Sequence, residues 1–257
     1  MAGRSDPRSL IDGIERLIQV DVGRNIGALF DASRGALWSA ASALESAHPG
    51  RVGLITGFYV PQGSPPAAET DGPVGAALLA KGFEAIGIPC RVATDKLCRS
   101  ADGSPRNMRG QDISSYTALL DDLFVAGPWQ TIAIGDGGNE IGMGAIPRSL
   151  IARHVAHGET IACVTAARHL IVAGVSNWGA YALIGALAVL RDDWCRTLLG
   201  CLDETLDRAV LEAMIEQGPA VDGVSRLPTP TVDNIDIATH HHILRTIRTL
   251  VEQKHAL

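Results

Sequence analysis

The sequence predicts an α/β protein with a mostly parallel sheet and helices on both faces, in the three-layer, doubly wound arrangement. Short apolar runs alternate with longer stretches of helical length, and polar, glycine-rich segments follow several of the apolar runs. Strands that alternate with helices pair in parallel and are covered on both faces by those helices. No internal repeat or long charged linker is present, so residues 1–257 are expected to form a single α/β domain with the N-terminal helices packed on it.

Two helices are expected at the N-terminus. Ser5 and Asp6 can cap a helix that opens at Pro7, because proline suits the first helical turn. A second, alanine-rich helix is expected over residues 28–47. The apolar face of the first helix carries Leu10, Ile11, Ile14, Leu17 and Ile18.

The strands and helices that follow are justified by length and composition. TIAIG (131–135) is short and apolar throughout, as expected of a strand buried on both faces, and Pro73 suits the first turn of a helix. The tail is expected to be helical, with a loop near 218–234 and a last helix over 236–251. The central order is strand 51–58, helix 73–87, strand 88–94, helix 114–127, strand 131–135, helix 147–158, strands 160–166 and 169–174, and helix 178–190.

Composition narrows the class of function. A net charge of −6 argues against nucleic acid as a partner, because phosphate binding needs a basic face. No apolar run approaches the ~18 residues of a membrane span, and no apolar stretch of a secretory signal follows Arg4. The five cysteines form no C-x-x-C pair, which argues against a disulfide framework or a zinc site. We therefore expect a cytoplasmic protein with a small-molecule partner, and a homo-oligomer stays open.

Polar, glycine-rich segments follow four of the expected strands. In open α/β sheets, ligands bind beyond the carboxyl ends of the strands, so these segments predict one small-molecule site. Glycine and asparagine that merely form turns are the alternative for any one segment. The four segments are YVPQGSPPAAETDGP (59–73), RSADGSPRNMRGQD (99–112), GDGGNEIGMG (135–144) and GVSNWG (174–179).

The segment GDGGNEIGMG matches no familiar phosphate or nucleotide motif. It lacks the G-K-[ST] ending of a P-loop, and no G-x-G-x-x-G opens a helix there. Its start is similar to the GDGGND motif of haloacid-dehalogenase-like phosphatases, but no early strand ends in the D-x-D pair that those enzymes need. These three readings are therefore rejected.

Several segments together resemble the D-glutamate cyclase C-terminal-like family, over roughly residues 15–251. Two departures are visible, namely a short stretch between Thr94 and Arg99, and Asn234 in place of glycine, which asparagine can replace in a left-handed turn. The segments are ETDGP (69–73), RSADG with NMRG (99–110), DDLF (121–124), GDGGNEIGMG (135–144) and AGVSNWGAYAL (173–183), with looser similarity at AVDGV (220–224) and VDNIDIATH (232–240).

The resemblance implies a hydro-lyase that converts D-glutamate, or a close analogue, to 5-oxo-D-proline with loss of water. Longer mitochondrial members join this domain to a separate N-terminal one. The alternative is therefore a non-catalytic domain that binds a small acidic metabolite, with the chemistry in another domain. A cluster of acids favours the enzyme, because binding an anion alone would call for more cations than the sequence offers.

Cyclisation needs a base for the ammonium group and a cation or donor set for the γ-carboxylate. We assign the chemical centre to Asp136, Asn139 and Glu140, acting as base or as ligands of a divalent cation such as Mg²⁺ or Mn²⁺; the cofactor itself stays unknown. The candidate substrate-binding residues are Glu69, Asp71, Asp102, Asn107, Arg109, Gly137, Gly138, Ser176, Asn177 and His240.

Structural roles compete with several of these assignments. Glu69 and Asp71 can simply cap the helix that opens at Pro73, and Asn177 can cap the helix that follows it. His240 shares a helical face with Asp236, where a solvated helix start is the alternative to a site residue.

Overall fold

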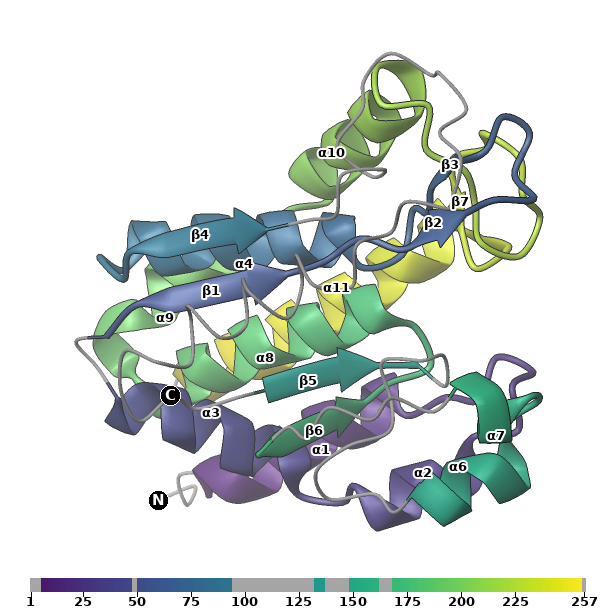
Figure 1. Ribbon diagram of the computed structural model, residues 1–257. Coiled ribbons are helices and arrows are strands. Elements are labelled where there is room, and N and C mark those ends of the chain that lie inside the picture. Colours follow the sequence, from purple (N-terminus) through teal and green to yellow (C-terminus); the bar gives the residue numbers. More distant parts are fainter. Residues whose placement is uncertain (1–5, 48–49, 94–131, 137–147, 162–167, 256–257) are drawn as a thin grey trace.

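The computed structural model describes residues 6–47, 50–93, 132–136, 148–161 and 168–255. It shows an α/β protein in which helices predominate and the strands are short (Figure 1). The helices are α1 (Pro7–Ile18), α2 (Gly27–Ala32), α3 (Ala36–Ser46), α4 (Pro73–Ala85), α6 (Arg148–His154), α7 (Gly158–Ile161), α8 (Ser176–Leu190), α9 (Asp192–Leu199), α10 (Glu204–Glu216) and α11 (Ile237–His255). The strands are β1 (Val52–Ile55), β2 (Tyr59–Val60), β3 (Ala67–Ala68), β4 (Cys90–Ala93), β5 (Ile132–Gly135), β6 (His169–Val172), β7 (Thr231–Val232) and β8 (Ile235–Asp236).

The longer strands form two parallel pairs. β1 pairs with β4, and β5 pairs with β6, so the predicted parallel pairing is confirmed for these strands. Their four arrowheads point to the same side of the molecule in Figure 1, which places their carboxyl ends together. The short strands β2 with β3 and β7 with β8 form antiparallel pairs on that side. The three-layer, doubly wound sheet and the single domain stay predictions.

Helix α8 is the centre of the core. All of its residues from Ser176 to Val189 are buried, and α1, α3, α4, α9 and α11 pack around it. Small residues along α8 let these neighbours approach closely. A Cβ on Gly179 would overlap Ile134 of β5, and a Cβ on Gly185 would overlap Ile247 of α11. A helix that is apolar all round belongs in the interior, as its sequence indicates.

The end of α1 and the residues that follow it pack against Gly174, which lies just before α8. The amide of Gly174 donates a hydrogen bond to the carbonyl oxygen of Ile18 over 2.8 Å. A Cβ at position 174 would overlap the carbonyl oxygen of Val20, so this contact requires glycine. The N-terminal segment is thereby held at the carboxyl ends of β5 and β6.

A buried polar network joins α8, α10 and α11. The hydroxyl group of Tyr181 donates a hydrogen bond to Asp207, and Nε2 of His241 lies 3.2 Å from the other carboxylate oxygen of Asp207. Nδ1 of His241 also lies 3.4 Å from Glu204. Burial raises the pKa of Asp207, although the hydrogen bond from Tyr181 opposes this rise. The network fixes α10, which buries few apolar side chains, onto the core.

Three sequence-based expectations about the elements were wrong in detail. The expected helix over 28–47 is divided into α2 and α3 at Gly35, whose φ of 82° is left-handed and interrupts the helix. Residues 160–161, expected to begin a strand, end the short helix α7. The strand expected over 51–58 ends at Ile55, and residues 59–60, expected in a polar segment, form β2 and pair with β3. The expected helix over 114–127 lies outside the described residues.

Candidate functional site

The N-termini of α4 and α8 meet near the carboxyl ends of the parallel strands and cap each other. Asp71, just before α4, accepts hydrogen bonds from the backbone amides of Ser176 and Asn177 at the start of α8, each over 3.0 Å. In return, the side-chain oxygen of Asn177 accepts from the amides of Gly72 and Gly75 at the start of α4, over 3.0 and 2.9 Å. These bonds satisfy donors that a helix start leaves unpaired. They also fix the Asp71 carboxylate at the end of α8.

Asp136 follows β5 directly, and its carboxylate meets that of Asp71. A third carboxylate, Asp233, reaches the same point from the turn between β7 and β8. One oxygen of each side chain lies within 4.8 Å of the other two, and all three side chains are buried. We call Asp71, Asp136 and Asp233 the carboxylate cluster.

Arg24, from the segment between α1 and α2, bridges two members of the cluster. One guanidinium nitrogen forms an ion pair with the Asp136 carboxylate and lies 3.1 Å from the Asp136 carbonyl oxygen. The other lies 2.6 Å from Asp233. Asp21 shapes this turn, because its carboxylate accepts hydrogen bonds from four consecutive backbone amides, those of residues 23 to 26.

A tight turn positions Asp233. Asp233 and Asn234 have φ angles of 57° and 60°, so both adopt the left-handed conformation. The tolerance expected for Asn234 is confirmed, since asparagine enters this region more readily than most residues. Asp222 holds the turn by accepting the amide of Asn234 over 2.7 Å. Burial raises the pKa of Asp222, but backbone donors such as the amides of Ser225 and Asn234 outweigh it and lower the pKa.

His240 supports the same turn from α11. The indole Nε1–H of Trp178 donates to Nδ1 of His240 over 2.8 Å, and Nε2 lies 3.3 Å from the carbonyl oxygen of Val232. Because an indole can only donate, Nδ1 accepts and Nε2 carries the proton that binds Val232. Burial lowers the pKa of His240 to about 4, so the ring is neutral at pH 7. The alternative of a solvated helix start is therefore wrong for His240.

The carboxylates perturb each other electrostatically. Burial, with the neighbouring carboxylates Asp136 and Asp233, raises the pKa of Asp71 well above its usual range. Burial and Asp136 likewise raise the pKa of Asp233 to about 7, while Arg24 opposes the rise. Burial lowers the pKa of Arg24, but Asp136 and Asp233 outweigh it and raise the pKa above its ordinary value. Such a cluster favours a positively charged partner.

The structure brings together several of the residues that the sequence singled out. Asp71, Asp136, Ser176 and Asn177 meet at the carboxyl ends of the strands, as predicted. Glu69 is half-buried beside Asp71 and contributes to raising its pKa. The remaining candidates lie outside the described residues, and so does the stretch between Thr94 and Arg99. These candidates are Asp102, Asn107, Arg109, Gly137, Gly138, Asn139 and Glu140.

Two expected capping roles require correction. Asp71 does not cap the helix at Pro73 but the N-terminus of α8. Asn177 is the second residue of α8, and its side chain caps α4 rather than its own helix. Each side chain reaches across to the other helix because the two N-termini adjoin. Sequence spacing cannot show this exchange.

Arg24 and Asp233 were missed by the sequence analysis. Arg24 lies in a glycine-rich turn between two expected helices, and an arginine in such a turn is normally exposed to solvent. Asp233 lies within the loosely similar segment 232–240, where Asn234 drew attention as a turn residue. The Val-Asp pair before a left-handed residue was the available signal for Asp233. Nothing in the local sequence distinguishes Arg24.

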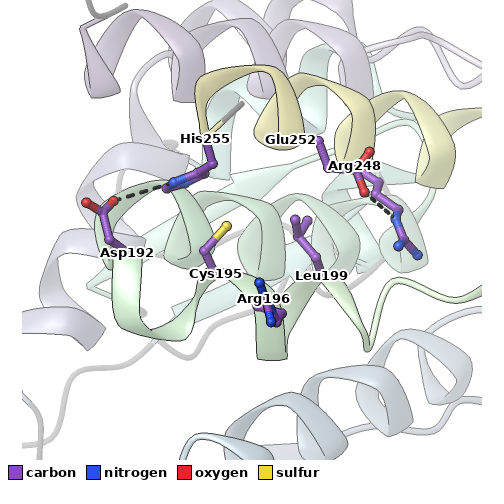
Figure 2. A pocket seen from close by; sticks show the side chains of 7 residues that line it. All are labelled: Asp192, Cys195, Arg196, Leu199, Arg248, Glu252 and His255. Carbon is purple, nitrogen blue, oxygen red and sulfur yellow. Dashed lines mark hydrogen bonds and ion pairs between the residues drawn. The ribbon is translucent and has the colours of Figure 1, made fainter. Parts of the chain in front are cut away.

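A separate surface pocket lies between α9 and the end of α11 (Figure 2). Asp192 and Cys195 line it from α9, and Arg248, Glu252 and His255 line it from α11. Two pairs of its side chains interact within its walls, because Arg248 binds Glu252 over 2.8 Å and His255 lies 3.7 Å from Asp192. Figure 1 places these elements at the end of the molecule opposite the carboxyl ends of the strands. The pocket is therefore distinct from the carboxylate cluster.

The fold and the cluster define an α/β protein with buried, arginine-linked carboxylates at the carboxyl ends of parallel strands. The chain belongs to the family described as D-glutamate cyclase-like, C-terminal, whose model matches residues 14–101 and 90–248. It is 43% identical over 103 residues to human D-glutamate cyclase, mitochondrial. That match covers 38% of this chain and 17% of the human protein.

The cytoplasmic location stays a prediction, because the human relative is named as mitochondrial. Among the described residues, no helix combines the length and the apolar character needed to cross a membrane.

Proposed function

We propose that the chain is a small-molecule enzyme that cyclises D-glutamate, or a close analogue, to 5-oxo-D-proline. The α-amino nitrogen attacks the γ-carboxyl carbon, a C–N bond forms, and a C–O bond breaks. Of the three ammonium protons, one stays on the lactam nitrogen and two leave with the oxygen as water. The reaction therefore needs groups that move protons and stabilise the departing oxygen.

The observation that carries this proposal is the carboxylate cluster together with Arg24, the arginine that binds it among the described residues. Three buried acids with one bound guanidinium favour a cationic group, such as the substrate ammonium or a metal ion, over a simple anion. This argues against the alternative of a domain that only binds an acidic metabolite. Family membership and the similarity to human D-glutamate cyclase support the reaction type.

Asp136 is the residue proposed to act at the chemical centre, with two roles open to it. As a base it would accept a proton from the substrate ammonium. As a metal ligand it would help to hold a cation against the γ-carboxylate. Asn139 and Glu140, a few residues further along the chain, remain proposed partners of Asp136 in either role.

The test is incubation of the purified chain with D- or L-glutamate, with and without Mg²⁺ or Mn²⁺, followed by chiral chromatography for 5-oxoproline. We expect product from D-glutamate with the parent chain, and none with Asp136→Asn. If Asp136 is a base, the variant still binds substrate and Mn²⁺; if it is a metal ligand, Mn²⁺ binding is lost as well.

Asp31→Asn is the matched control, because the Asp31 side chain is 75% exposed and forms an ion pair with Arg34, which is 77% exposed. It removes the same charge away from the cluster and should retain full turnover. Absence of product from both enantiomers and with both metals would contradict the proposal and favour the binding domain. Normal turnover by Asp136→Asn would show that Asp136 is not at the chemical centre.

A further inference from the structure

The carboxylate cluster holds more negative charge than its arginine can balance. The side chains of Asp71, Asp136 and Asp233 are all buried, and among the described residues Arg24 is the cation that forms ion pairs with Asp136 and Asp233. Two carboxylates in contact cannot both be ionised in a buried site unless a cation separates them. The cluster thus accommodates further positive charge.

A second observation indicates where this charge belongs. Oδ2 of Asp233 is buried and has no hydrogen-bond partner among the residues that the structure describes. The Asp233 side chain is only 4% exposed, so bulk water does not solvate this oxygen. Buried polar atoms almost always have a partner, and an orphaned carboxylate oxygen calls for a proton donor or a metal ion. Asp233 supplies one of the three clustered ligand atoms.

The spacing of the three carboxylates matches one ion. Oxygens bound to a single Mg²⁺ lie at most ~4.2 Å apart, and those bound to a single Ca²⁺ at most ~5.2 Å apart. The three ligand atoms lie within 4.8 Å of one another, close enough for one oxygen of each side chain to bind the same ion. Three carboxylates are fewer than the 6–8 oxygens of a typical Ca²⁺ site, whereas Mg²⁺ commonly keeps several waters and few protein carboxylates. Carboxylate oxygens also suit Mn²⁺.

We propose that Asp71, Asp136 and Asp233 bind one divalent cation of the Mg²⁺ or Mn²⁺ type. The inference rests on the proposed function in that it names a ligand for the same site, and it selects the metal-ligand role for Asp136. Hydrogen bonds from the start of α8 orient Asp71, the end of β5 places Asp136, and the left-handed turn presents Asp233. Three separate parts of the chain therefore contribute one ligand each.

Isothermal titration of the EDTA-treated full chain with MnCl₂, and separately with MgCl₂ and CaCl₂, tests the site directly. We expect one Mn²⁺ per chain, and at least about tenfold weaker binding by Asp233→Asn, which retains the shape but loses the ligand charge. Asp31→Asn should bind like the parent. Circular dichroism and melting in EDTA establish that each variant is folded before the titration.

Arg24→Gln provides a test in the opposite direction. Removing the guanidinium removes a competing positive charge beside Asp136 and Asp233, so Mn²⁺ should bind at least about threefold more tightly. Arg34→Gln, which changes an exposed arginine that is 77% accessible, should leave the affinity unchanged.

Three results would overturn the inference: no Mn²⁺ or Mg²⁺ binding by the parent, parent-like affinity in Asp233→Asn, or loss of binding in Arg24→Gln. Tight binding of Ca²⁺ alone would overturn the choice of ion type. The outcome is separable from the proposed function, because titration does not depend on turnover. A chain that binds Mn²⁺ at this cluster but makes no 5-oxoproline would retain the metal site and reject the reaction.

Discussion

Asp71 and Asn177 show how one side chain can serve both the fold and the site. Asp71, just before α4, caps the N-terminus of α8, and Asn177, at the start of α8, caps the N-terminus of α4. Asp71 also contributes a carboxylate to the cluster. Helix N-termini carry unpaired amides and a partial positive charge, which suits an aspartate there. The same contacts that stabilise α4 and α8 therefore position a candidate ligand.

His240 is a neutral, buried histidine whose effect on stability should depend on pH. Its pKa is lowered from 6.5 to about 4 in the folded chain, so below pH 6.5 the unfolded chain binds more protons. The contribution of His240 to the free energy of unfolding should therefore fall as pH drops from about 6.5 towards 4. The fall attributable to this histidine is about 3 kcal/mol.

Urea unfolding at several pH values measures this effect. His240→Gln should be less stable than the parent at pH 7, because it disturbs the bonds to Trp178 and Val232, yet it should lose less stability on acidification. His242→Gln is the control, since His242 neighbours His240 on α11 but is exposed. Equal pH dependence in the parent and His240→Gln would show that another group is responsible.

Helix α8 shows how small residues determine close packing between elements. Gly179 faces Ile134 of β5, and no Cβ fits between them without movement. Alanine has the higher helix propensity, by about 1 kcal/mol over glycine. In a close-packed interior, however, an inserted methyl group forces neighbours to shift.

Gly179→Ala should therefore lower the free energy of unfolding by about 1–3 kcal/mol, despite the better propensity. Gly13→Ala is the matched control in α1, where an added Cβ would meet only a side-chain nitrogen of Arg16 at 3.9 Å. That control should be neutral or stabilising by about 0.5–1 kcal/mol. Chemical denaturation of both variants checks the contrast, and a stabilised Gly179→Ala would mean that β5 can move away from α8.

The arrangement of the molecule makes α8 the core and leaves α10 at its periphery. Every residue from Ser176 to Val189 is buried in α8, whereas α10 buries only Asp207 and Leu211. Figure 1 shows α8 between the two parallel strand pairs, and α10 at the outside. Regions with few buried apolar contacts open at lower cost than the core.

Hydrogen exchange followed by mass spectrometry should resolve this difference. Peptides from α8 should exchange only through global unfolding, with protection that falls in step with denaturant stability. Peptides from α10 should exchange faster through local opening. Slower exchange in α10 than in α8 would contradict the expectation that α8 is the more stable helix, and would place the stable core elsewhere.

The amino-acid sequence by itself determined the α/β class, the strand that ends at Gly135, the strand that begins at His169, and the family. Alternation of apolar runs with helical stretches is a local property, and so is the placement of an acid just after a strand. The convergence of Asp71, Asp136 and Asn177 could be predicted because the carboxyl ends of parallel strands lie on one side of a sheet.

Only the tertiary structure decided the rest of the site. Arg24 and Asp233 lie far apart in the chain, in turns whose local sequence indicates only solvent exposure. They meet because Gly174 lets the N-terminal segment approach β6, and because Asp222 holds the turn that presents Asp233. Such long-range contacts follow from packing and from the pairing of buried charges, and neither is written in residue spacing.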